Sequence, residues 1–198
     1  MNDRTIGVAD SGSFHASTVP HDMVADITSV SQKSHMAKLA VGDVFLVPLD
    51  GERYGIGQLA GDWKGELYVV IYDKVVSHDA SPADIDGAEL TFAALTLDAK
   101  LHHGDWLVVG NRRDNLPDIP QPWFAVGVGG ETHIEARDRS VTRRATSAEA
   151  AGLRNRTVVA PVRIERATKA FHGLGEWDAR FDDLRADYAL QSAKLAGG

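Results

Sequence analysis

Short apolar runs separated by turn residues fill the first half of this chain and predict β-structure. A β-meander of three strands is predicted at residues 44–47, 54–59 and 67–72. After the first run, Pro48 cannot donate to a strand ladder, and Asp50-Gly51 favours the positive φ angles of hairpin turns. Gly55 and Gly57 in the second run favour a bulge or the sharp bend of a small barrel. The third run is apolar at consecutive positions, so we expect both of its faces to be buried.

The second half of the chain alternates further strand signals with polar segments. Further strands are predicted at residues 90–97, 106–109, 123–128, 132–136 and 158–164. Gly129-Gly130 is a turn candidate within a hairpin, and Pro161 indicates an edge position for the last strand. Residues 75–89 are expected to form a polar loop or a short helix. Residues 111–122 contain three prolines, which predict an extended, exposed loop without a helix.

Apolar residues near the end of the chain recur at spacings of three and four, which predicts one amphipathic helix. The stripe consists of Leu174, Trp177, Phe181, Leu184, Tyr188, Gln191 and Leu195. We expect it to pack on the sheet, with a dimer seam as the alternative. The predicted organisation is an N-terminal extension (1–36), a β-rich domain (37–168) and the C-terminal helix (169–198). The fold class is mostly β (α+β), either a small twisted sheet or a partly open SH3-like barrel followed by that helix.

Composition narrows the possible chemistry. The 198 residues contain no cysteine, which excludes disulfides, thiolate zinc sites, iron–sulfur clusters and a cysteine nucleophile. The chain shows no apolar run of membrane-spanning length and no segment that resembles a signal peptide, so we expect a cytoplasmic protein without membrane contact. The eight histidines do not follow a metal-ligand spacing. No catalytic residues, no metal site and no cofactor are predicted.

Charge is unevenly distributed along the chain. Residues 1–136 hold 9 Lys and Arg against 20 Asp and Glu, a net charge of −11. Residues 137–169 hold 9 against 3, or +6, and the remaining residues hold 3 against 5, or −2. A nucleic-acid binder needs clustered Lys and Arg for its phosphate contacts, so the acidic main body argues against one. It favours a basic protein partner instead.

With these patterns in view, the chain resembles the immunity protein 26 family of bacterial polymorphic toxin systems. The resemblance rests on Gly42-Asp43-Val44-Phe45, Val47-Pro48-Leu49, Asp50-Gly51, Tyr54-Gly55, Gly57, Ile71-Tyr72-Asp73 and a Trp-x-x-x-Gly motif at either Trp106 to Gly110 or Trp123 to Gly127. It implies a cytoplasmic protein that is encoded beside a toxin and neutralises this toxin by binding it. The cognate toxin is then the expected partner, and a nuclease toxin would present a basic active-site surface to an acidic protein.

The tips of the first hairpins are the predicted contact patch for this partner. The patch consists of Asp50, Glu52, Asp62, Trp63 and Glu66, in which Trp63 would be an interface anchor. An alternative hypothesis is a small β-barrel module that binds a peptide, a small ligand or nucleic acid. Its basic face would be formed by Arg137, Arg139, Arg143, Arg144, Arg154 and Arg156, unless these arginines neutralise the acidic body. The sequence leaves the oligomeric state open.

Overall fold

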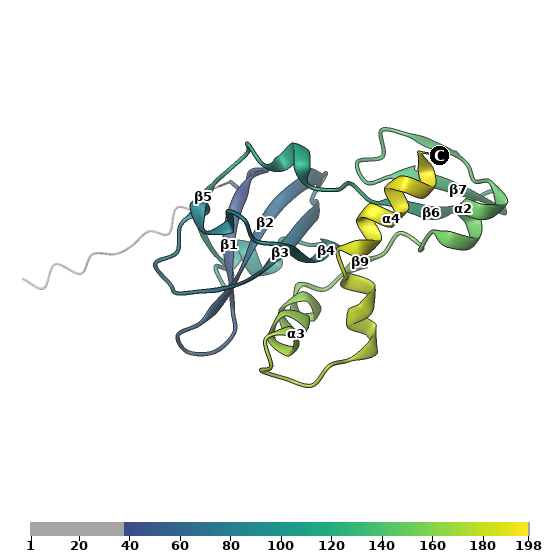
Figure 1. Ribbon diagram of the computed structural model, residues 1–198. Helices are drawn as coiled ribbons and strands as arrows, with labels where there is room; N and C mark the ends of the chain where they lie inside the picture. Colours follow the sequence, from purple (N-terminus) through teal and green to yellow (C-terminus); the bar gives the residue numbers. More distant parts are fainter. Residues whose placement is uncertain (1–37, 198) are drawn as a thin grey trace, which may run out of the picture. The chain divides into compact units, whose positions relative to one another are not determined.

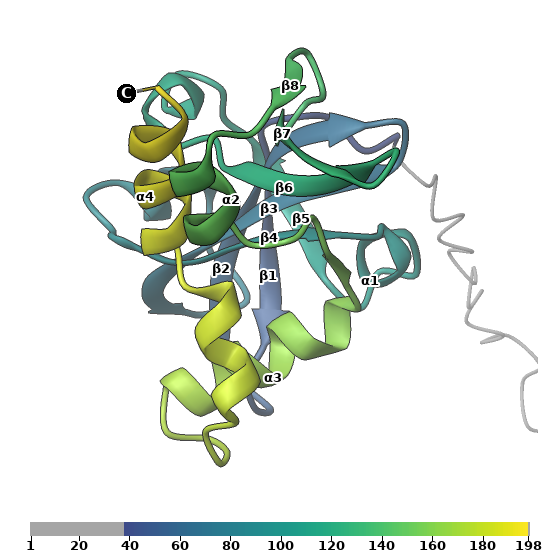
Figure 2. The ribbon, with the colours of Figure 1, turned by 90° about the vertical axis from the view of Figure 1, so that its right-hand side faces the viewer.

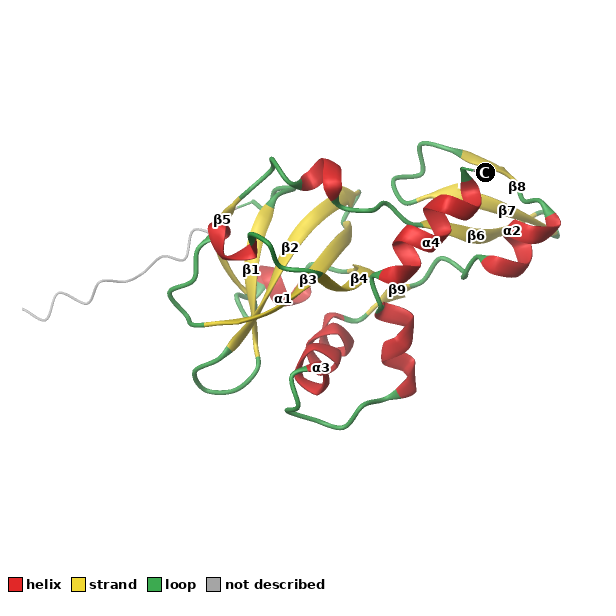
Figure 3. Ribbon diagram, viewed as in Figure 1, coloured by secondary structure: helices red, strands yellow, loops and turns green. Residues whose placement is uncertain are grey.

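The computed structural model describes residues 38–197. The expected N-terminal extension, residues 1–36, therefore lies outside the described residues, together with the short element expected near residues 23–30. The described chain contains two sheets and four α-helices, with three short 3-10 helices between them (Figures 1 and 3). It is a mixed α+β fold with more strand than helix.

A six-stranded sheet is the main scaffold, and its strands follow the order β5-β1-β2-β3-β4-β9. The strands are β1 (Asp43–Pro48), β2 (Tyr54–Trp63), β3 (Glu66–Val76), β4 (Leu90–Thr96), β5 (Leu107–Asn111) and β9 (Val158–Val159). All neighbours are antiparallel except β4 and β9, which are parallel. The order ends at β5 and β9, and these two are not paired with each other. The sheet is therefore open, and the described residues form no closed barrel.

The β1–β2 turn differs from the predicted two-residue turn. Neither Asp50 nor Gly51 has a positive φ angle. Instead the Leu49 N–H donates to the Arg53 carbonyl at 3.0 Å, and the Asp50 carboxylate accepts from the Glu52 and Arg53 amides at 3.2 and 2.9 Å. The carboxylate thus closes a longer loop that needs no left-handed residue. The two-residue turn with positive φ at both positions occurs at the next hairpin, in Lys64-Gly65.

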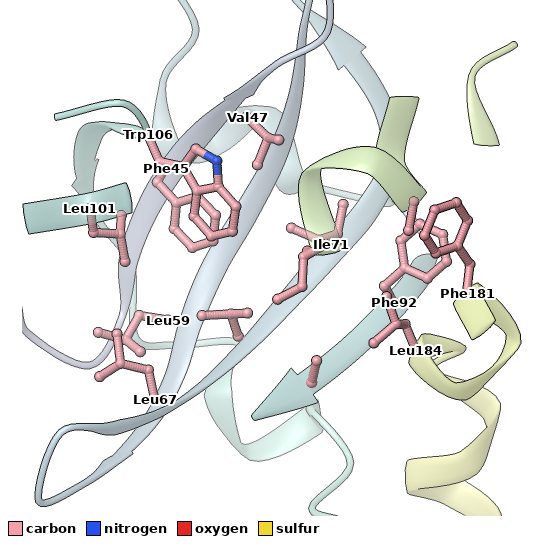
Figure 4. Close-up of a cluster of buried hydrophobic side chains, with 14 residues drawn as sticks. Phe45, Val47, Leu59, Leu67, Ile71, Phe92, Leu101, Trp106, Phe181 and Leu184 are labelled. Carbon is pink, nitrogen blue, oxygen red and sulfur yellow. The ribbon is translucent and has the colours of Figure 1, made fainter. Parts of the chain in front are cut away.

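Both faces of the main sheet are buried, as the third apolar run predicted. On β3, Leu67, Val69 and Ile71 point to one face, and Tyr68, Val70 and Tyr72 point to the other. Figure 4 shows the first face, where the rings of Phe45 and Trp106 stack at 5.1 Å. The helices α1 (Ala99–His102) and α3 (Pro161–Phe171) contribute to this layer with Leu101 and Ile164. The 3-10 helix η3 (Ala179–Leu184) adds Phe181 and Leu184.

The opposite face is covered by two connecting segments. The β3–β4 connection contains the 3-10 helix η1 (Pro82–Ile85), whose Ile85 is buried against Val44 and its neighbours. The β5–β6 connection contains the 3-10 helix η2 (Leu116–Asp118) and buries Ile119. The prediction of an exposed, extended loop at residues 111–122 was therefore wrong, because Leu116 and Ile119 are apolar enough to cover the sheet. A buried Gln58 completes the layer and accepts a hydrogen bond from the Tyr72 hydroxyl at 2.6 Å.

The glycines of β2 allow neighbouring side chains to approach the β2 backbone closely, and they do not close a barrel. A Cβ atom on Gly57 would lie 2.7 Å from the Phe45 ring and from the Ile71 side chain. A Cβ atom on Gly55 would lie 2.8 Å from Thr168 of α3. The expected bulge is present, since the β2–β3 register shifts between Gly55 and Ile56. The missing side chains let the aromatic stack and α3 approach the sheet.

A second, three-stranded sheet follows the main one in the sequence. It consists of β6 (Trp123–Val128), β7 (Glu131–Ala136) and β8 (Thr142–Arg144) in the order β6-β7-β8. The Gly129-Gly130 turn joins β6 and β7, as predicted, with positive φ at both glycines. The helices α2 (Ser147–Gly152) and α4 (Asp187–Ala196) pack against this sheet (Figure 2). Ile134 and Leu153 form the centre of its small core.

Two predictions about the end of the chain were wrong. The last strand is only the two residues Val158–Val159, because Pro161 occupies the first turn of α3, where its missing N–H costs nothing. In place of the predicted single C-terminal helix, the chain forms η3 and then α4, with a break between them. At this break the Ala186 amide donates to the Thr91 carbonyl of β4 at 3.1 Å. The stripe residues Phe181 and Leu184 still pack on the main sheet.

The N-terminus of α2 supplies a pH-dependent contribution to stability. The Arg143 guanidinium, at 2.5 Å, and the Thr146 amide hold the Glu149 carboxylate and lower its pKa from 4.5 to about 2. This contribution is fully present above about pH 4.5 and is lost as the pH falls towards 2. We expect the difference in unfolding free energy between the wild type and Glu149→Gln to shrink over this interval in denaturant titrations. Glu176→Gln is the control, because the exposed Glu176 side chain has no ion pair or hydrogen bond among residues 38–197. A difference that does not depend on pH would contradict the prediction.

Candidate functional site

The predicted contact residues lie at two ends of the main sheet. Asp50 and Glu52 belong to the β1–β2 turn, whereas Asp62, Trp63 and Glu66 belong to the β2–β3 hairpin. These turns lie at opposite ends of the ten-residue strand β2. A strand rises about 3.3 Å per residue, so the two groups are about 30 Å apart along the sheet. The structure thus separates the predicted patch into two groups. Asp62, Trp63 and Glu66 form one group, and Asp50 and Glu52 form the other.

The β1–β2 turn lies beside the β3–β4 connection, because Tyr54 pairs with Val76. The rings of Tyr54 and His78 also meet edge to face at 5.9 Å. We define the acidic end of the sheet as residues 48–54 and 73–89. These two segments contain 7 Asp and Glu against 2 Lys and Arg, a net charge of −5. The acidic residues are Asp50, Glu52, Asp73, Asp79, Asp84, Asp86 and Glu89.

Some of these carboxylates maintain the local structure. Asp50 forms an ion pair with Arg53, and the hydrogen bonds from Arg53 and Glu52 lower the pKa of Asp50 to about 2. Asp84 accepts hydrogen bonds from Ser81, which lower its pKa. Asp86 binds Arg112 of the β5–β6 connection. Their charges are partly compensated inside the fold.

Three other carboxylates at the acidic end are exposed and uncompensated. Glu52, Asp73 and Glu89 have no cationic side chain within ion-pairing distance in the described part of the chain. Asp73 and Glu89 are close together, because the Asp73 amide donates to the Glu89 carbonyl at 2.8 Å. These three carboxylates therefore project negative charge from the β1–β2 turn and the β3–β4 connection. Only Glu52 of these three was among the residues predicted from the sequence, because the pairing of β3 with β4 is needed to place Asp73 and Glu89 beside it.

At the opposite end, Glu66 is partly buried in a network of ion pairs. Its side chain is 11% exposed and pairs with Arg156, which is 7% exposed. Arg156 also pairs with Glu135 at 3.0 Å, and Arg139 lies 3.5 Å from Glu66 and 3.6 Å from Glu135. We call these four residues the ionic clasp. It connects the β2–β3 hairpin of the main sheet to β7 of the second sheet.

Trp63 and Asp62 also make local contacts. The Arg139 guanidinium lies 3.9 Å from the centre of the Trp63 ring and Lys64 lies 5.1 Å from it, so the ring is partly covered by cations. Trp63 is the last residue of β2 rather than part of a turn. Asp62 remains exposed and accepts a hydrogen bond from the Gly65 amide at 2.8 Å.

Most arginines of the basic segment are bound to carboxylates of the same chain. Besides Arg139 and Arg156 in the ionic clasp, Arg143 pairs with Glu149 at 2.5 Å and Arg144 pairs with Glu131 at 2.9 Å. Arg137 donates to Gln121 at 2.8 Å instead. The segment thus neutralises acidic residues of the body, which leaves little free positive charge for phosphate contacts. The acidic end keeps its excess of negative charge.

The described residues contain no group of three or more side chains arranged to hold a metal ion. None of the helices in residues 38–197 is long and apolar enough to cross a membrane. The exposed excess of carboxylates at one end of the main sheet creates a negative potential, which attracts positively charged molecules.

One comparison with protein families bears on the function of the chain. Residues 40–133, slightly less than half of the chain, match the family model of immunity protein 26. No curated protein and no solved structure matches the chain. The match confirms the resemblance found in the sequence and covers β1 through the first half of β7. The match implies an immunity role, in which a protein neutralises a toxin by binding it, and this role is typically non-catalytic.

Proposed function

We propose that this protein acts in the cytoplasm as the immunity protein of a polymorphic toxin system and that the acidic end of its main sheet binds the cognate toxin. The proposal rests on the family match over residues 40–133 and on the charge of the acidic end. The single observation that carries it is the uneven compensation of charge. The carboxylates near the basic segment are paired, whereas Glu52, Asp73 and Glu89 are exposed without a cation among residues 38–197.

A toxin with a basic active-site surface fits this arrangement, and a nuclease is the toxin class that we propose. Complementary potentials raise the association rate and disfavour partners of the wrong charge. Asp50 and Glu52 remain contact residues in this proposal. Asp62 and Trp63 would touch only a partner that also reaches the other end of the sheet, and Glu66 would act indirectly through the ionic clasp.

Co-expression with the product of the neighbouring toxin gene tests the proposal. We expect host cells that express this product alone to stop growing, and cells that also express the immunity protein to survive. The two proteins should co-purify as a stable complex. A matched control is an immunity protein with the core substitution Phe45→Asp, which disrupts the fold and should not rescue growth. Absence of both toxicity and a complex would refute the proposed function.

A further inference from the structure

A pocket of about 250 Å³ lies where the main sheet, the β5–β6 connection and the C-terminal segments meet. Its walls include Tyr68, Leu95, Phe124, Arg154, Leu184 and Tyr188. This pocket is separate from the acidic end. Tyr68 and Leu95 are paired across β3 and β4, towards the end of the sheet that carries the β2–β3 hairpin.

The aromatic walls of the pocket are held by hydrogen bonds to the backbone. The Tyr68 hydroxyl donates to the Pro120 carbonyl at 2.8 Å. The Tyr188 hydroxyl donates to the Trp123 carbonyl at 2.6 Å and accepts from the Arg154 amide at 3.0 Å. These contacts fix both rings before anything binds. A preorganised apolar wall lowers the entropy cost of binding an apolar group.

Arg154 provides a positioned and uncompensated positive charge at this pocket. Its guanidinium lies 4.5 Å from the centre of the Tyr188 ring, and its Nη1 donates to the Asp183 carbonyl at 3.0 Å. No carboxylate of residues 38–197 lies within ion-pairing distance of it. By contrast, Arg163 in the same pocket pairs with the Asp183 carboxylate at 3.2 Å. Arg154 therefore keeps free donors for an anionic group, and a planar guanidinium suits a carboxylate.

The size of the pocket indicates what it holds. Pockets for drug-sized ligands span roughly 300–1,000 Å³, so this one is better suited to a single large side chain. Buried aromatic anchors that fill such pockets dominate the energy of many protein interfaces. More than half of the lining residues, including Arg154 and Tyr188, lie beyond the family-matched segment. The pocket thus combines the family scaffold with the chain's own C-terminal part.

We propose that this pocket anchors an aromatic side chain of the bound toxin and that Arg154 binds a carboxylate next to that side chain. This inference rests on the proposed function and adds a second contact to the acidic end. The acidic end would determine the rate of association, whereas the anchored side chain would slow dissociation. The pocket would therefore determine which toxin is held.

Two pocket variants of the full-length protein test the inference against the wild type. Arg154→Gln removes the charge, and Ala93→Phe fills the pocket from β4. We expect each variant to raise the Kd for the neighbouring toxin-gene product at least tenfold, mainly through faster dissociation in surface plasmon resonance. The matched controls are Arg166→Gln on α3 and Ala148→Phe on α2, both exposed and outside this pocket. They should bind like the wild type.

A small probe tests the chemistry of the pocket without the toxin. N-acetyl-tryptophan carries an aromatic side chain and a carboxylate, and its amide lacks the negative charge. We expect N-acetyl-tryptophan to shift the methyl NMR signals of Leu95 and Leu184, with a millimolar Kd, and its amide to bind more weakly. Arg154→Gln should remove this preference, and Ala93→Phe should abolish the shifts.

The outcomes separate this inference from the proposed function. If the wild type binds the toxin and both folded pocket variants bind it equally well, the inference is refuted and the immunity role stands. If the wild type does not bind the toxin, the proposed function fails and the anchor role fails with it. Equal binding of the acid and its amide would refute the role of Arg154.

Discussion

Replacing Arg156 by leucine is expected to lower the free energy of unfolding by about 3–5 kcal/mol. Arg156 is 7% exposed and faces two carboxylates, Glu66 and Glu135, that are 11% and 12% exposed. Removing the cation leaves two partly buried like charges near each other, compensated only by Arg139. The loss should appear as a lower midpoint of urea unfolding, followed by circular dichroism. The dependence of the unfolding free energy on urea concentration should stay similar if unfolding remains two-state.

Two further variants make this expectation specific to the ionic clasp. Arg144→Leu removes a pair in which Arg144 is 73% exposed and Glu131 is 49% exposed, so it should cost no more than about 1 kcal/mol. Combining Arg156→Leu with Glu66→Leu and Glu135→Leu should recover much of the lost stability, because no unpaired carboxylate remains. The one charge left over, Arg139, is 35% exposed and keeps its contact with the Trp63 ring. A loss below 1 kcal/mol for Arg156→Leu alone would show that the clasp does not hold the hairpin to the second sheet.

The clasp also explains why the sequence alone could not locate the contact surface. Glu66 and Arg156 are 90 positions apart, and nothing in the local pattern indicates that they meet. The acidic body and the basic segment are visible in the sequence, but the pairs of charges that neutralise each other are not. One available signal was missed. In an antiparallel meander, successive turns lie at opposite ends of the sheet, so the two hairpin tips could have been separated from strand length alone.

The strands were predictable where local pattern and tertiary environment agree. The runs at residues 44–47, 54–59 and 67–72 all lie within observed strands, because the buried sheet requires apolar residues at consecutive positions. The prediction of a single C-terminal helix was wrong for the opposite reason. The spacing of three and four is present in the sequence. The helix is nevertheless interrupted, because the Ala186 amide donates to the Thr91 carbonyl of β4 and the Arg185 backbone forms an antiparallel β-bridge with Phe92. A tertiary hydrogen bond outweighed local periodicity there.

The position of the Arg185 side chain strengthens this break. Its guanidinium lies 4.7 to 5.6 Å from the ring centres of Trp177, Phe171 and Phe92. These cation–π contacts join the residues before η3, the end of α3 and β4. The Arg185 backbone pairs with Phe92 of β4 while its side chain reaches all three rings. The sequence shows the aromatic residues but not their convergence on one arginine.

Reversing three charges at the acidic end is expected to slow toxin association by a factor of about 10 to 10³ at low salt. The variant is Glu52→Lys, Asp73→Lys and Glu89→Lys, which changes the net charge of the acidic end from −5 to +1. The wild-type association rate should fall steeply as salt increases, because the Debye length shrinks from about 30 Å at 0.01 M to about 10 Å at 0.1 M. The variant should lose or invert this dependence. Its dissociation rate should change less, since exposed charges mainly affect encounter.

The control for this variant must change the total charge equally at another place. Glu176→Lys, Asp182→Lys and Asp187→Lys do so, because all three carboxylates are exposed in the C-terminal segments. If the toxin docks at the acidic end, stopped-flow measurements should show a much smaller change for the control. Equal slowing by both variants would mean that net charge, and not the acidic end, steers the toxin. An unchanged rate for the first variant would exclude the acidic end, because no long-range attraction from Glu52, Asp73 and Glu89 would then remain to guide the partner.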